Sequence, residues 1–220
     1  MREFNAFAGY PEPKNPRIVG PNLRNIHNRI QASYRDKEFY DGDRKNGYGG
    51  MVDDGRWKPI AKHIVESYNL HEGSRVLQVA AHKGFLLYEF YKLGMRVSGQ
   101  ETSYYAAECS KITLDISLFT ELPYKDRTFD FVIGASCVYT LNLLDAIKCL
   151  REIQRVGTGR SWVTLAAYEK PEDLMLLRYW FLLGTTILTK AEWLEVMEHA
   201  GYTGDYRFDT AKYLNLVEAK

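Results

Sequence analysis

The chain has 220 residues, of which 45% are hydrophobic, and a formal net charge of +1. This length supports one α/β domain with one core, and the small charge excludes a global attraction to nucleic acid or to anionic membranes. Cys109, Cys137 and Cys149 show no CxxC spacing, which argues against a disulfide framework or a zinc site. We therefore expect a reducing, cytoplasmic setting, no metal and no nucleic-acid partner.

The beginning of the chain shows no apolar core of signal-peptide length. No uninterrupted apolar run approaches the about 20 residues that span a bilayer, so we expect no membrane partner.

Residues 1–35 contain four scattered prolines and predict an irregular arm. Residues 34–57 alternate glycines with tyrosines and charges, without helical or strand period, and predict an ordered loop or lid. We therefore expect an arm and Gly/Tyr-rich lid over residues 1–56 and one Rossmann-like domain over residues 57–220. The lid offers side chains that could contact a ligand or a partner chain, or could simply pack on the core: Tyr40, Asp41, Arg44, Tyr48, Arg56 and Trp57.

From residue 57 onward, helical and strand patterns alternate. Apolar residues recur at helical spacing over residues 57–68, 84–94, 103–111, 142–156, 171–184 and 189–201. Strand patterns occupy residues 75–81, 95–101, 112–117, 129–136, 161–168 and 212–219. Strands separated by helices predict a mostly parallel, seven-stranded sheet with helices on both faces.

Two of the expected helices carry additional signals. Thr189 and Glu192 form a capping-box pattern, and Gly201 is placed to end the same helix. The segment 171–184 is apolar around most of its circumference, which predicts burial on two sides. Either the C-terminal helix of the same chain covers it, or it contributes to a dimer or to a hetero-oligomer.

Ligands of open parallel sheets bind beyond the carboxyl ends of the strands, which places the turn after the first sheet strand, 80–84, at the expected site. Glu101 ends the next strand, and its carboxylate could accept hydrogen bonds from a ribose, or could cap a helix.

The segments VLQVAAHKGFLLYEFYKLGMRVSGQE, ELPYKDRTFDFVIGAS and AGYTGDY resemble a class I S-adenosylmethionine-dependent methyltransferase from about residue 40 onward. The stretch YDGDRKNGYGG with DGRWKP resembles a bacterial subgroup associated with surface-polysaccharide or small-metabolite gene clusters. In this family the first strand ends in a pattern like D-V-G-C-G-x-G, and the resemblance implies S-adenosylmethionine as cofactor.

The sequence departs from the family pattern in three separate places. Gln78 replaces the expected aspartate, and Ala80, Ala81 and His82 stand where glycines are expected, whereas Gly84 matches. Leu118 and Phe119 follow the third sheet strand, where the family holds the adenine. The segment after the fourth sheet strand carries Tyr139 and lacks the histidine that the resemblance leads us to expect there.

Three separate losses have one simple common cause, the loss of cofactor binding. The sequence therefore favours a pseudo-methyltransferase that binds no cofactor and acts as a scaffold or regulatory subunit of an active paralogous methyltransferase, or as a dimer. His82 then fills the vacated space. Two alternatives stay open: an active methyltransferase of a sugar or small metabolite, with S-adenosylmethionine repositioned and His82 or Tyr139 as catalytic base, and a binding protein for another nucleotide or metabolite.

Overall fold

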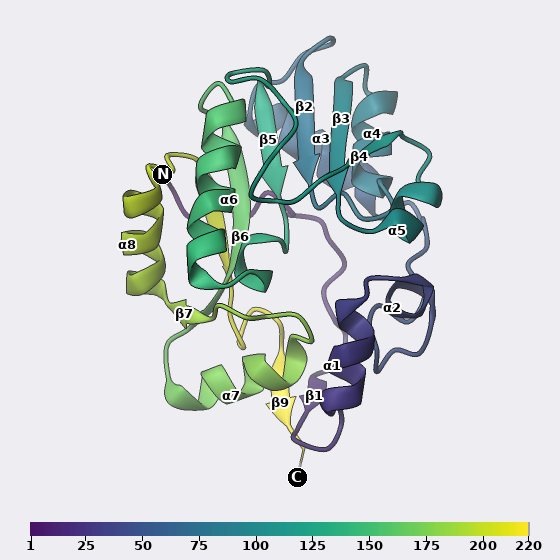
Figure 1. Ribbon diagram of the computed structural model, residues 1–220, viewed down its shortest axis with the longest axis vertical. Coiled ribbons are helices and arrows are strands. Elements are labelled where there is room, and N and C mark those ends of the chain that lie inside the picture. The colour runs from purple at the N-terminus through teal and green to yellow at the C-terminus, as the bar shows by residue number, and fades with distance from the viewer. Residues whose placement is uncertain (220) are drawn as a thin grey trace.

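The computed structural model describes residues 1–219 and contains one seven-stranded sheet with helices on both faces (Figure 1). The strand order is β4-β3-β2-β5-β6, and β6 pairs along its other edge with both β8 and β7. Every pairing in this sheet is parallel, which confirms the predicted architecture. Its strands are β2 Arg75–Val79, β3 Arg96–Glu101, β4 Leu114–Ile116, β5 Phe131–Gly134, β6 Ser161–Tyr168, β7 Leu188–Thr189 and β8 Asp205–Asp209.

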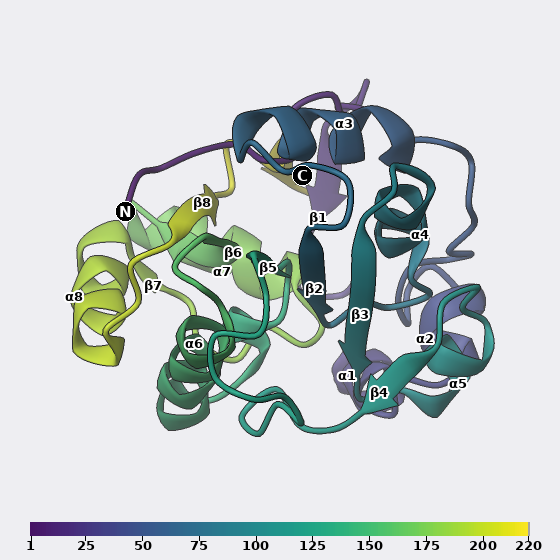
Figure 2. The same ribbon diagram turned by 90° about the horizontal axis from the view of Figure 1, so that it is seen from above.

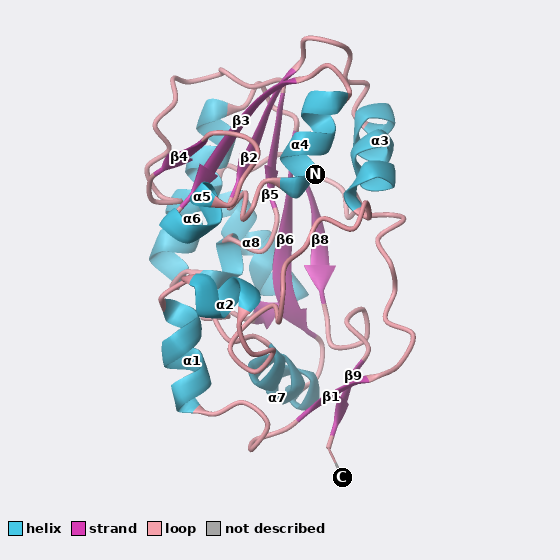
Figure 3. Cartoon of the chain, turned by 90° about the vertical axis from the view of Figure 1, so that its right-hand side faces the viewer, coloured by secondary structure: helices cyan, strands magenta, loops and turns pink. Residues whose placement is uncertain are grey.

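The helices form two layers, with α3 and α4 on one face of the sheet and α6 and α8 on the other (Figures 2 and 3). Neighbouring β2 residues serve different layers, because Val76 packs toward α3 and α4 whereas Leu77 packs toward α6 and α8. The helices are α1 Ile26–Ser33, α2 Lys37–Asp41, α3 Trp57–Ser67, α4 Phe85–Lys92, α5 Tyr104–Glu108, α6 Leu143–Val156, α7 Pro171–Trp180 and α8 Lys190–Ala200, with a 3₁₀ turn η1 at Val138–Thr140.

Local sequence signals explain where α8 begins and ends. The Thr189 hydroxyl accepts from the Glu192 backbone N–H at 3.2 Å, and the Glu192 carboxylate accepts from the Thr189 backbone N–H at 2.7 Å. Gly201 follows at φ +70°, a left-handed conformation that glycine adopts without strain. The predicted capping box and terminal glycine are therefore confirmed.

The expectation of an irregular arm is wrong in part. Residues 1–35 contain β1 (Arg17–Val19) and α1, and the lid contains α2. Asn25 and Asp36 start these helices, since each side chain accepts hydrogen bonds from two backbone N–H groups of the first turn. The predicted strand at 212–219 shortens to β9 (Leu216–Glu218), which leaves the main sheet and pairs in parallel with β1. The sequence patterns did not predict β7 or β8.

The helix predicted over residues 171–184 ends at Trp180, because Phe181 has an extended backbone. Leu177 is fully buried, in a cluster with Val19 of β1 and Leu216 of β9. Segments of the same chain therefore pack on this helix, but they are β1 and β9, so the prediction that the C-terminal helix covers it is wrong. The predicted burial on two sides is also wrong, because Leu177 is the only buried residue of α7.

Residues 17–41, which hold β1, α1 and α2, lie with α7 and β9 beyond the carboxyl ends of the sheet strands (Figure 3), whereas residues 3–7 pack along β8 and α3. Within residues 1–219, no helix has the length and apolar character required to cross a bilayer.

Candidate functional site

A cavity of about 1100 Å³ separates the carboxyl ends of the strands from the arm, the lid and α7. We call it the central cavity. Its sheet side is formed by Gln78 and the 81–83 turn, together with Ala135 and Ser136 after β5. Tyr48 of the lid and Trp180 of α7 lie on the wall that faces the sheet. The cavity occupies the place where the parallel sheet predicts a ligand.

The turn between β2 and α4 keeps a glycine-type backbone without the expected glycines. Ala80, His82 and Gly84 have φ angles of +55°, +53° and +68°. Each non-glycine residue in this region costs roughly 1–2 kcal/mol. Hydrogen bonds hold the turn, since the Ala81 backbone N–H donates to the Gln100 carbonyl at 2.9 Å and the Gly84 N–H to the Ala81 carbonyl at 2.9 Å. The backbone path is thus retained although two side chains now project from it.

Glu101 is fully buried at the end of β3 and organises this turn. Its carboxylate accepts the His82 backbone N–H at 2.7 Å, the Thr102 N–H at 2.8 Å and the Ser103 N–H at 3.1 Å. The residue does not line the central cavity. In this arrangement the Glu101 carboxylate binds backbone amides and is not presented to a ligand.

The His82 imidazole lies over Glu101 and is enclosed by two lid tyrosines. Its Nδ1 is 3.9 Å from the Glu101 carboxylate and 3.3 Å from the Tyr40 hydroxyl, and its Nε2 is 3.4 Å from the Tyr48 hydroxyl. Burial lowers the pKa of His82, so the ring is neutral at pH 7. The imidazole therefore fills the space beside the acidic residue at the end of β3.

An ion pair fastens the lid to the same turn. Lys83 Nζ lies 2.6 Å from both carboxylate oxygens of Asp41 and 3.1 Å from the Met51 carbonyl. The Tyr105 hydroxyl donates to the same carboxylate at 2.6 Å. Burial alone would raise the pKa of Asp41, but hydrogen bonds from Lys83 and Tyr105 outweigh it and lower that pKa. We call this group the lid latch.

No profile of a known protein family matches the sequence. Solved structures nevertheless resemble the chain. One from the complex between the Haloferax volcanii Trm112 methyltransferase activator and a methyltransferase aligns with a TM-score of 0.54 at 22% identity, over 67% of this chain and 73% of that one. A protein of Bacillus halodurans described as a methyltransferase aligns with a TM-score of 0.55 at 15% identity, over 64% and 68% of the two chains. The YcgJ protein of Bacillus subtilis gives 0.54 at 17% identity, over 64% and 66%.

The chain has a methyltransferase fold. Within that fold, Gln78 stands at the carboxyl end of β2, only 5% exposed, and borders the central cavity. Its side-chain oxygen Oε1 has no hydrogen-bond partner among the described residues. A buried acceptor without a donor is unfavourable, so Gln78 leaves one polar contact open at the cavity wall.

Of the candidate residues after β4 and β5, one lines the central cavity and two do not. Leu118 is 61% exposed and does not line the cavity, whereas Phe119 is buried. Tyr139 lines the cavity and packs against Phe181, with ring centres 4.7 Å apart. Burial raises the pKa of Tyr139 well above its usual value, so its hydroxyl stays protonated at neutral pH. The carboxylate beside His82, that of Glu101, is 3.9 Å from Nδ1 and already accepts three backbone N–H groups. Among residues 1–219, the Tyr139 hydroxyl makes no hydrogen bond to a carboxylate.

The six lid side chains named from the sequence separate into three groups. Tyr40, Asp41 and Tyr48 contact the β2–α4 turn, as described above. Arg44 lies on the α7 side of the central cavity. Arg56 pairs with Asp54 and donates to the Tyr10 hydroxyl at 3.0 Å, and Trp57 packs on Tyr10 with ring centres 5.4 Å apart. Arg56 and Trp57 therefore join the lid to the arm.

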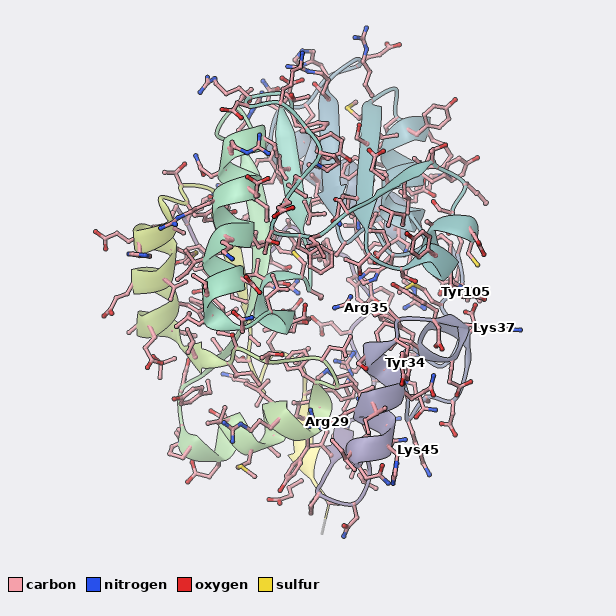
Figure 4. The ribbon with its side chains drawn as sticks, viewed as in Figure 1. Arg29, Tyr34, Arg35, Lys37, Lys45 and Tyr105 are labelled. Carbon is pink, nitrogen blue, oxygen red and sulfur yellow. The ribbon has the colours of Figure 1, made fainter. Side chains whose placement is uncertain are left out.

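Sequence reasoning missed Arg35, which is labelled in Figure 4 at the centre of the molecule. Its guanidinium lies 5.5 Å from the Phe119 ring centre and donates to the Thr140 hydroxyl at 3.3 Å. The arm thus reaches across the carboxyl ends of β4 and β5. One sequence signal could have indicated it, because residues 13–35 carry one lysine and four arginines and no carboxylate.

Proposed function

We propose that this protein is a non-catalytic member of the methyltransferase fold, which does not bind S-adenosylmethionine and acts as a scaffold or regulatory subunit of an active paralogous methyltransferase. The observation that carries the proposal is the position of His82. Its imidazole covers Glu101, whose carboxylate is fully buried and already accepts three backbone N–H groups. A ribose at the end of β3 would have to displace both interactions.

Two further observations support the absence of the cofactor. Arg35 covers Phe119 after β4, on the side of the sheet where the resemblance implies the adenine. Gln78 offers a neutral amide where the resemblance implies a carboxylate, so a cofactor amine would lose a charge-assisted hydrogen bond. The proposal therefore rests on three neighbouring changes in one region of the fold.

An exposed apolar stripe supports the scaffold role. Ile26 and Ile30 of α1 and the following Tyr34 are 63%, 48% and 67% exposed, at four-residue spacing on one side of the helix. We propose that this stripe contacts the partner methyltransferase, in line with the Haloferax neighbour, whose structure was solved with an activator protein. The same arm carries Arg35, so a bound partner would be connected to the central cavity.

The decisive experiment is calorimetric titration of the full chain with S-adenosylmethionine and S-adenosylhomocysteine. We expect no binding up to millimolar ligand, and we expect the triple variant Gln78→Asp, Ala80→Gly, His82→Gly to gain it. Gln78→Asp alone is the matched control, because it supplies the carboxylate but leaves the imidazole over Glu101. Micromolar binding by the unaltered chain would overturn the proposal.

The scaffold role has a separate test. Ile26→Asp and Ile30→Asp should abolish co-purification with a paralogous methyltransferase from the same organism, whereas Leu194→Asp should not. Leu194 is the control because it is 40% exposed on α8, at the opposite side of the molecule (Figure 1). Equal retention by all three variants would contradict a partner contact on α1.

One observation favours the alternative of an active methyltransferase with a repositioned cofactor. The central cavity equals or exceeds the usual volume of small-molecule sites, and Gln78 Oε1 leaves an acceptor open on its wall. Under that alternative, S-adenosylmethionine would supply the methyl group, and the cavity would hold it away from Glu101. Binding by the unaltered chain that His82→Gly leaves unchanged would identify this case.

A further inference from the structure

Three arginines converge on one tryptophan at the α7 side of the central cavity. The guanidinium carbons of Arg17, Arg24 and Arg44 lie 4.8, 5.1 and 5.4 Å from the centre of the Trp180 ring. The three come from β1, from the turn before α1 and from the loop after α2. All four side chains line the central cavity. We call the three arginines the arginine cluster.

Among residues 1–219, the arginine cluster has no carboxylate partner. None of the ion pairs among residues 1–219 involves Arg17, Arg24 or Arg44. Their hydrogen bonds go to the backbone carbonyls of Leu214, Trp180, Arg44 and Gly47. Each guanidinium has five N–H donors, so these four bonds use fewer than a third of the donors of the cluster.

The fold holds these like charges together against their repulsion. Burial, with the charges of Arg44 and Arg29, lowers the pKa of Arg24 to about 10. Burial and Arg44 also lower the pKa of Arg17. Because the whole chain carries a net charge of only +1, this excess of positive charge is local. A bound anion would remove the repulsion and satisfy the remaining donors.

A structural role accounts for part of this arrangement. Arg24 donates to the Trp180 carbonyl at 2.6 Å, and Arg29 donates to the Phe181 and Leu182 carbonyls at 3.1 and 3.3 Å. Both arginines thereby cap the carboxyl end of α7, where the helix dipole favours a cation. In Figure 4, Arg29 lies between α1 and α7. Capping explains Arg29 fully and Arg24 in part, but it does not explain Arg17 or Arg44.

We propose that the arginine cluster binds the diphosphate group of a small organic molecule, whose remainder occupies the central cavity. Guanidinium forks match pairs of phosphate oxygens, and a diphosphate carries enough negative charge to engage several arginines at once, unlike a single carboxylate. The cavity volume of about 1100 Å³ leaves room for an attached organic group. This inference is independent of the proposed function, because no residue of the cluster belongs to the β2–α4 turn.

The test is calorimetric titration of the full chain with inorganic pyrophosphate and, separately, with inorganic phosphate. We expect pyrophosphate to bind more tightly than phosphate, and we expect Arg17→Gln and Arg44→Gln each to weaken it by about tenfold. Arg29→Gln is the matched control, because it removes a neighbouring α7 cap that does not line the cavity, and it should bind like the unaltered chain. Arg44 is exposed, so its substitution does not disturb the core.

Tryptophan fluorescence supplies a second readout. Of the four tryptophans, Trp162 and Trp193 are fully buried, and Trp57 lines the cavity but packs on Tyr10. The arginine cluster contacts Trp180, so pyrophosphate should change the emission of Trp180, and Trp180→Phe should abolish most of that change. Absence of pyrophosphate binding at millimolar concentration would overturn the inference. An equal loss in Arg29→Gln and Arg44→Gln would also overturn it, since binding would then depend on the α7 cap. Both results are independent of whether S-adenosylmethionine binds.

Discussion

The ion pair of the lid latch allows the loss of stability in Asp41→Asn to be predicted. In Asp41→Asn, Lys83 loses its only ion-pair partner among residues 1–219 and keeps neutral contacts, the amide oxygen at position 41, the Met51 carbonyl and the Tyr105 ring, although Lys83 is only 7% exposed. Removing one partner of a buried ion pair costs 3–5 kcal/mol, and the partial exposure of Asp41, 24% for its side chain, reduces this cost by solvent screening. We therefore expect Asp41→Asn to lower the free energy of unfolding by about 2–3 kcal/mol.

Urea unfolding followed by circular dichroism measures this loss. Tyr105→Phe removes one hydrogen bond from the same carboxylate without stranding a charge, and it should cost about 1 kcal/mol. The double variant Asp41→Asn, Lys83→Met should be more stable than the sum of the single losses implies, because neither charge remains unpaired. A loss below about 0.5 kcal/mol for Asp41→Asn, the usual effect of a surface substitution, would refute the latch.

Three further outcomes follow from the same region. Glu101→Gln should lower the free energy of unfolding by about 2 kcal/mol, because three backbone N–H groups lose a charged acceptor; no change in urea unfolding would show that these bonds do not hold the turn. Ala80→Gly should leave the free energy of unfolding nearly unchanged, because relief of the left-handed backbone strain offsets the losses of chain entropy and apolar burial. Ala146→Gly in α6 relieves no such strain and should lower the free energy of unfolding by about 1–2 kcal/mol. Equal losses in the two variants would contradict backbone strain at Ala80. Because the pKa of Asp41 is lowered, its contribution to stability is fully present above the pKa of an unfolded aspartate and is lost as pH falls through the lowered pKa. The free energies of unfolding of the unaltered chain and of Asp41→Asn should therefore converge at low pH. A difference that does not change with pH would exclude this linkage.

Elements with local signals could be predicted from the sequence. The strand pattern SWVTLAAY predicts β6 at its observed bounds, 161–168, and the capping box and glycine locate α8. The parallel pair β1–β9 could not be predicted, because each strand has three residues and its partner lies about 200 residues away in the chain. Its stability comes from packing on α7, which no local pattern records.

In the candidate site too, residues with a local sequence signal could be predicted and residues with distant partners could not. Ala80 and His82 were identified because they interrupt a glycine pattern, and both have the left-handed backbone that such a pattern serves. Arg35 and Arg17 were missed because their partners, Thr140 and Trp180, are more than 100 residues distant in sequence. The local sequence signal for these arginines is the absence of carboxylates from residues 13–35, which indicates a positively charged segment of the arm.

The pairing of β1 with β9 has a consequence for the order of assembly during synthesis. β1 leaves the ribosome about 200 residues before its partner strand, which at typical rates is a delay of about 10–40 s. The sheet strands up to β6 can pair during this interval, while the arm that carries Arg17 still lacks its partner strand. The α7 side of the central cavity is therefore completed last, so a small ligand or a partner subunit could reach the site of the growing chain before that wall closes.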